Sequence, residues 1–102
     1  RSDPRQRVYL DRINSTIVVA TEAPSVKIYL DENGRLDSTV QGQVLLAELI
    51  TEAVCREIAR QGVESGRFLA PDGAEADAIQ SHFIRLQNRY AHMIHEVIVT
   101  KE

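Results

Sequence analysis

Residues 44–60 read VLLAELITEAVCREIAR, and this stretch decides the fold. It contains no glycine or proline, and its apolar residues recur every three or four positions, which predicts an α-helix. The pattern extends over residues 37–61, with a polar N-cap among residues 37–39 and Gly62 in the position of a C-cap glycine. Because apolar side chains occupy most of its circumference, we expect this helix to be covered on more than one side.

The two sides of this helix differ in chemistry. At about 100° per residue, one broad apolar stripe is expected to face the core, and it consists of Val40, Val44, Ala47, Ile50, Val54 and Ile58. A charged stripe with four-residue spacing runs opposite, and it consists of Glu48, Glu52, Arg56 and Arg60. Two leucines flank the charged stripe, away from the predicted core. We therefore expect a second contact surface, made of Leu45, Leu49, Glu52 and Arg56.

A second long helix is predicted over residues 75–99. Its apolar residues form one stripe at helical spacing, which consists of Ile79, Phe83, Leu86, Tyr90, Met93, Ile94 and Val97. Residues 63–74 contain two glycines and a proline and are interpreted as the connector between the helices. A connector of this kind predicts that the two helices lie antiparallel.

The N-terminal part of the chain favours short strands. Residues 16–20, TIVVA, are rich in β-branched side chains and predict a strand. Residues 8–10 are also apolar, and turn-forming residues at 11–15 would join the two segments as a hairpin. Residues 24–30 fit either a third strand or a short helix entered through proline, because the two periods cannot be separated over so few positions.

The fold class predicted from these elements is α+β, with two or three short N-terminal strands packed on two long antiparallel helices. The 102 residues suffice for one domain, assigned to residues 8–102, and the polar residues 1–7 are interpreted as a tail or linker. The chain begins with arginine, so we expect it to be a fragment of a larger protein.

Composition argues against several classes of function for this chain. The net charge is −3, so the basic face expected of a nucleic-acid-binding domain is missing. No apolar run approaches the roughly 18–20 residues of a membrane span. A single cysteine cannot form an internal disulfide and fits a reducing compartment, which predicts a cytoplasmic location.

Residues 90–97, YAHMIHEV, place His92, His95 and Glu96 within five positions. His92 and Glu96 are four residues apart and share a helix face, as two metal ligands could. The stretch matches no zinc-protease helix motif, however, and two arginines on the same side would repel a cation. We predict no metal, no cofactor and no catalytic residue here, and interpret the polar side as solvated or facing a partner.

Residues 17–26, IVVATEAPSV, followed by the helix at 44–60, resemble a segment in the C-terminal parts of some bacterial proteins of the gyrase, heat-shock chaperone and histidine-kinase ATPase superfamily. There a strand leads into a threonine-x-histidine-proline-x-aliphatic turn and then a long apolar helix. Thr21, Pro24 and Val26 match this pattern, whereas alanines replace the histidine and a usual asparagine. The resemblance implies an accessory domain downstream of an ATPase module, and no ATPase residue can be carried over.

The predicted function is that of a non-catalytic interaction or oligomerisation domain in a larger cytoplasmic protein of bacterial type. Its partner would be a second copy, giving a homodimer, or the remainder of the parent chain. One alternative is a small-ligand or regulatory-binding module, with its pocket between residues 16–20 and the two helices. Another is a small enzyme that uses His92, His95 and Glu96, or two carboxylates of the first helix.

Overall fold

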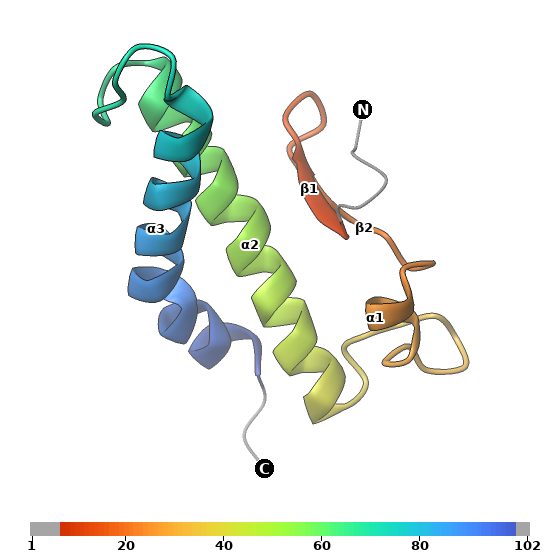
Figure 1. Cartoon of the computed structure of the whole chain (residues 1–102). Coiled ribbons are helices and arrows are strands. Elements are labelled where there is room, and N and C mark those ends of the chain that lie inside the picture. The colour runs from red at the N-terminus through yellow and green to blue at the C-terminus, as the bar shows by residue number, and fades with distance from the viewer. Residues whose placement is uncertain (1–6, 100–102) are drawn as a thin grey trace.

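The computed structural model describes residues 7–99, so most of the predicted tail at 1–7 lies outside the described residues. In chain order the elements are β1 (Val8–Asp11), β2 (Thr16–Val19), α1 (Pro24–Lys27), α2 (Val40–Glu64) and α3 (Glu75–Ile98). Figure 1 shows α2 and α3 side by side as an antiparallel pair, with the hairpin on the other side of α2. The predicted α+β class is confirmed, and two strands form the sheet.

The hairpin forms as its sequence indicates. β1 pairs antiparallel with β2, so that Val8 lies opposite Val19 and Asp11 opposite Thr16. The Asp11 carboxylate accepts hydrogen bonds from the backbone N–H of Ile13 at 3.1 Å. A side chain that caps its own turn in this way is typical of aspartate. Val8 is buried against α2, and this contact fixes which face of the hairpin is inward.

The open choice at residues 24–30 is resolved as a helix. Pro24 lies in the first turn of α1, where its missing N–H leaves no hydrogen bond unmade. This single turn buries Val26 completely and continues into a loop. In that loop Gly34 has φ +77°, the left-handed conformation that the Asn-Gly turn predicts.

Helix α2 begins as predicted but ends later. Thr39 is the N-cap, and its hydroxyl accepts from the backbone N–H of Gly42 at 3.0 Å. The prediction that Gly62 caps the C-terminus is wrong, because Gly62 is buried inside the helix. A Cβ at this position would lie 2.3 Å from Cδ2 of Phe68, so glycine is needed for the connector ring to pack on the helix. The helix ends one turn later, before Gly66 at φ +81°.

Two apolar clusters hold α2 from different sides. One joins the helix to the hairpin and to α1, and its buried members are Val8, Val26, Leu36, Leu45, Leu49 and Ala53. The other joins it to α3, and its buried members are Cys55, Ala59, Phe83 and Leu86. The expectation that α2 is covered on more than one side is therefore confirmed, with both covers supplied by this chain.

The stripe predicted to form the core of α2 is only partly interior. Ala47 is fully buried, but Val40 and Ile58 at the two ends of the stripe are exposed. The side that approaches α3 uses small residues at four-residue spacing instead, namely Ala47, Thr51, Cys55 and Ala59. Small side chains along an i, i+4 row let two helix backbones come close together. Volume, more than hydropathy, decides which side of α2 meets α3.

Helix α3 covers the predicted range, but its apolar stripe is buried only in part. Phe83 and Leu86 are interior, whereas Met93 and Val97 on the later turns are exposed. Within residues 7–99, no helix combines the length and the apolar character needed to cross a membrane.

Candidate interaction surface

The described chain leaves an apolar groove between α2 and α3. It has a volume of about 450 Å³, and its apolar lining includes Val54, Ile58, Leu86, Tyr90, Met93 and Ile94. We call this feature the helix-pair groove. It lies on the side of α2 that carries the exposed stripe, away from the hairpin. Apolar surface that is continuous across two elements differs from isolated exposed residues and is typical of an interaction site.

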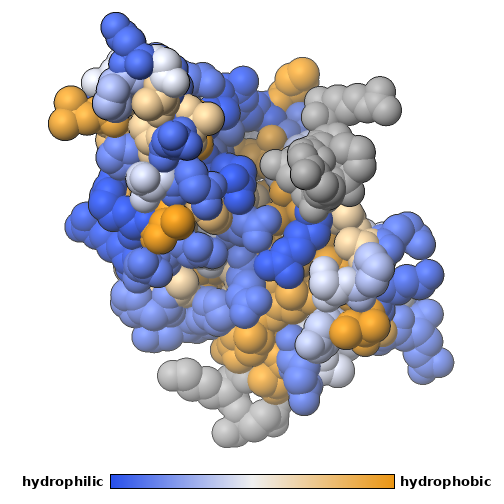
Figure 2. Space-filling model, viewed as in Figure 1, coloured by the Kyte–Doolittle hydropathy of each residue, from blue (hydrophilic) through white to orange (hydrophobic). Residues whose placement is uncertain are grey.

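Protruding side chains extend the apolar surface beyond the groove. Met93 is 53 % exposed and Val97 is 82 % exposed, so half of Met93 and most of Val97 lie outside the packing of this chain. Figure 2 shows hydrophobic side chains gathered where α2 begins and α3 ends, while the visible surface above them is mainly hydrophilic. On α3 itself, apolar surface continues past the groove to the exposed Val97 near the C-terminal end of the helix.

Two arginines on α3 line the groove without a carboxylate partner in the described part of the chain. The Arg85 guanidinium lies 5.2 Å from the centre of the Phe68 ring and contacts His82 Nδ1 at 3.2 Å. The Arg89 guanidinium lies 5.5 Å from the centre of the Tyr90 ring. Cations held over aromatic faces in this way keep their charge available to an acidic group.

The floor of the groove contains a buried cysteine. Cys55 lines it, yet the residue is only 1 % exposed. Burial raises the pKa of the Cys55 thiol above its ordinary value, because the charged thiolate is disfavoured in an apolar setting. The sulfur therefore acts as a small apolar side chain that helps α3 approach α2.

The residues of the predicted second contact surface do not form a free surface in the structure. Leu45 is 7 % exposed and Leu49 is 0 % exposed, so the expectation that these leucines face outward is wrong. The hairpin and α1 cover them. Glu52 is partly buried and accepts from the Arg7 guanidinium at 3.3 Å, and the Arg56 guanidinium lies 4.3 Å from the centre of the Phe83 ring. All four side chains are used in packing within this chain.

Two of the histidines of α3, His92 and His95, line a second hollow, of about 550 Å³, on the polar side of the helix pair. The structure brings His92 and His95 to the same hollow as Glu48, whereas Glu96 does not line it. Within residues 7–99, no hydrogen bond links the side chains of His92, His95 and Glu48. Over the same range, no three His, Cys, Asp or Glu side chains converge as metal ligands. The geometry provides a polar recess without an assembled acid–base pair.

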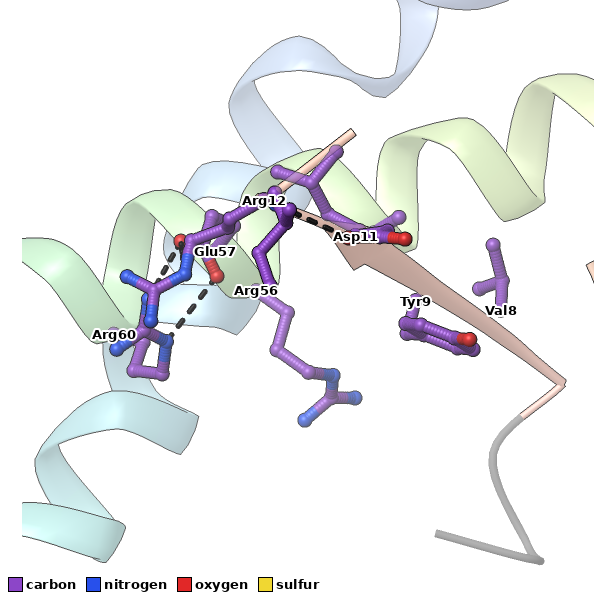
Figure 3. A pocket seen from close by; sticks show the side chains of 10 residues that line it. Val8, Tyr9, Asp11, Arg12, Arg56, Glu57 and Arg60 are labelled. Atoms are coloured by element: carbon purple, nitrogen blue, oxygen red, sulfur yellow. Dashed lines mark hydrogen bonds and ion pairs between the residues drawn. The ribbon is translucent and has the colours of Figure 1, made fainter. Parts of the chain in front are cut away.

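A third hollow, of about 720 Å³, lies between β1 and α2. Figure 3 shows Arg12 and Arg60 directed at Glu57, while Arg56 points away from it. Arg60 contacts the Glu57 carboxylate at 2.6 Å and Arg12 contacts it at 3.5 Å. The charges of Arg12, Glu57 and Arg60 are thus engaged with one another. It lies beside β1, whereas the predicted ligand pocket was expected beside residues 16–20.

The exposed half of the α3 stripe is the part of the surface that sequence reasoning missed. Met93 and Val97 belong to the predicted apolar stripe that begins at Ile79, and the pattern does not distinguish its buried part from its exposed part. A signal was present in α2, whose row of small residues marks the side where α3 packs and leaves the branched Val54 and Ile58 less buried.

Comparison of the chain with known protein families, with curated proteins and with solved structures finds no match. The class of protein is therefore defined by fold and surface alone. It is an α+β domain in which a β-hairpin and a long antiparallel helix pair leave one apolar groove uncovered.

Proposed function

We propose that this chain is a non-catalytic self-association domain that forms a homodimer through the helix-pair groove. We place this domain in a larger cytoplasmic protein of bacterial type. This placement agrees with the resemblance to accessory segments downstream of ATPase modules. The observation that carries it is the groove itself, continued by Met93 and Val97 at 53 % and 82 % exposure.

A second copy suits the surface because the surface consists of two antiparallel helices. Two such helix pairs can pack as a four-helix bundle, in which each copy covers the groove of the other. A two-fold dimer needs one self-complementary patch and no second kind of surface. Each copy would transfer Met93 and Val97 from water into apolar surroundings, which stabilises the pair.

The test is the solution mass of the chain and of two matched variants by light scattering. Met93→Glu places a charge at the groove, and Ile84→Glu places the same charge elsewhere on α3. The two positions are similarly exposed, at 53 % and 47 %. They are nine residues apart, which puts them on opposite sides of the helix at about 100° per residue.

We expect wild type and Ile84→Glu to have twice the mass of one 11.5 kDa chain, and Met93→Glu to be a monomer with unchanged helical circular dichroism. A monomeric wild type would contradict the proposal. Equal behaviour of the two variants would also contradict it, because the groove side would then have no special role.

A further inference from the structure

We propose that the two copies pair their α3 helices antiparallel, about a two-fold axis near Met93, with Arg89 of each copy against Glu96 of the partner subunit. This inference rests on the proposed self-association and specifies its geometry. It defines an interaction surface by the charges that the described chain leaves without partners.

The first argument is a stripe along the outer side of α3. Its members are the exposed residues Arg89, Met93 and Glu96, which follow one another at intervals of four and three residues. This alternation is the period of a helix–helix seam, in which such residues face a partner helix. The stripe borders the helix-pair groove, because Arg89 and Met93 belong to both.

The second argument is the state of the two charged residues. Arg89 and Glu96 are both exposed, and neither forms an ion pair within the described chain. They are seven residues apart and therefore occupy equivalent positions on the stripe. A partner helix that covers Met93 must also pass over these two charges.

The charges distinguish the two possible directions of the partner helix. A parallel pair places each residue level with its own copy, so arginine would face arginine and glutamate would face glutamate. An antiparallel pair about Met93 reverses the order and places Arg89 near Glu96 of the partner subunit, twice by symmetry. Like charges at short distance repel and opposite charges attract, so the antiparallel direction is favoured.

The same direction also suits the apolar side chains. Met93 lies near the axis and would pack beside Met93 of the partner subunit. Methionine adapts its shape readily to a contact of this kind. Val97, one turn further along α3, would reach toward the earlier part of the partner's stripe, over the groove between Leu86 and Ile58.

The test compares dimer dissociation constants, measured by analytical ultracentrifugation, for Arg89→Glu, Glu96→Arg and the double charge swap. Each single variant replaces two attractive contacts with two repulsive ones, so we expect each to weaken the dimer by about tenfold or more. The double variant restores opposite charges, and its constant should return to within about threefold of wild type. Asn88→Glu, which adds a charge on another side of α3, serves as the control and should leave the constant unchanged.

Other outcomes separate this geometry from the proposed function. If wild type is a dimer but the double variant stays as weak as the single variants, the Arg89–Glu96 contact is overturned while self-association stands. Equal constants for wild type, both single variants and the double variant would indicate a parallel pair or another contact, and would overturn the geometry. A monomeric wild type would overturn both proposals.

Discussion

At the scale of single residues, the charged side chains of α2 choose different partners from those that the stripe predicts. The sequence favours a pair between Glu52 and Arg56, four residues apart with the acid first. In the structure Arg56 lies on an aromatic ring and Glu52 meets Arg7. Arg60 instead joins Glu57 and Glu64, each at 2.6 Å. Several partners at i+3 and i+4 compete for each arginine, so the pattern alone does not choose among them.

Glu57 is a largely buried carboxylate that is paired with Arg60 and Arg12. Burial raises the pKa of Glu57, but hydrogen bonds from Arg60 and Gln61 and the charges of Arg60 and Arg12 outweigh that effect. The pKa of Glu57 in the folded chain is therefore below its ordinary value of about 4.5. A lowered pKa in the folded state means that the ionised carboxylate stabilises the fold above its unfolded pKa. That stability is lost as pH falls through the folded pKa.

We expect Glu57→Gln to lower the free energy of unfolding at pH 7 by roughly 1 kcal/mol, because the amide cannot retain the charged contacts. The difference from wild type should be full at pH 6–7 and should shrink as pH falls below about 4. Urea unfolding at several pH values measures it. Glu32→Gln, at an exposed loop position, provides the control. A difference between wild type and Glu57→Gln that is constant from pH 7 to pH 3 would contradict this account.

At the scale of elements, the sequence predicts what forms more reliably than which side is buried. The hairpin, both long helices and the Thr39 cap follow from β-branched runs, helical period and capping chemistry. The buried side of α2 cannot be predicted in the same way, because Leu45 and Leu49 lie beside the charged residues Glu48 and Glu52 in the helical pattern. The helix is apolar nearly all round, so its hydropathy has no single maximum that fixes its orientation. The hairpin's fit against those leucines decides it.

We expect Leu49→Ala to destabilise the monomer by about 2–5 kcal/mol, because it opens a cavity in the cluster between α2 and the hairpin. Ile58→Ala should cost about 1 kcal/mol or less, since Ile58 is 38 % exposed. Both are measured by urea unfolding in the Met93→Glu background, so that association does not contribute. The predicted core stripe gives the opposite ranking, and a larger loss at Ile58 would therefore favour that interpretation.

At the scale of the whole molecule, the layers do not close around the helix pair. The hairpin and α1 cover one side of α2 and α3 covers another, which leaves the side that contains the helix-pair groove. An α2 that is apolar nearly all round predicts that more than one of its sides is covered. Which sides the chain itself covers could not be predicted, because that depends on how the hairpin and α3 pack on the helix. The expected surface at Leu45 and Leu49 was filled internally, and the free surface lies by Met93.

This incomplete closure has a thermodynamic consequence for unfolding. If the native state is a dimer and the unfolded state is a single chain, dilution favours unfolding by mass action. Each tenfold increase in protein concentration adds about 1.4 kcal/mol to the free energy of unfolding per dimer. We therefore expect the urea midpoint of wild type to rise by roughly 0.5 M per tenfold increase in concentration.

The matched measurement uses Met93→Glu, whose midpoint should not change with concentration because its native state is a single chain. Circular dichroism across a hundredfold range of concentration provides both series. A wild-type midpoint that is also independent of concentration, together with a monomeric mass, would show that the layers around the helix pair are sufficient by themselves. A sloping midpoint in wild type and a flat one in Met93→Glu would locate the missing layer of the fold at the helix-pair groove.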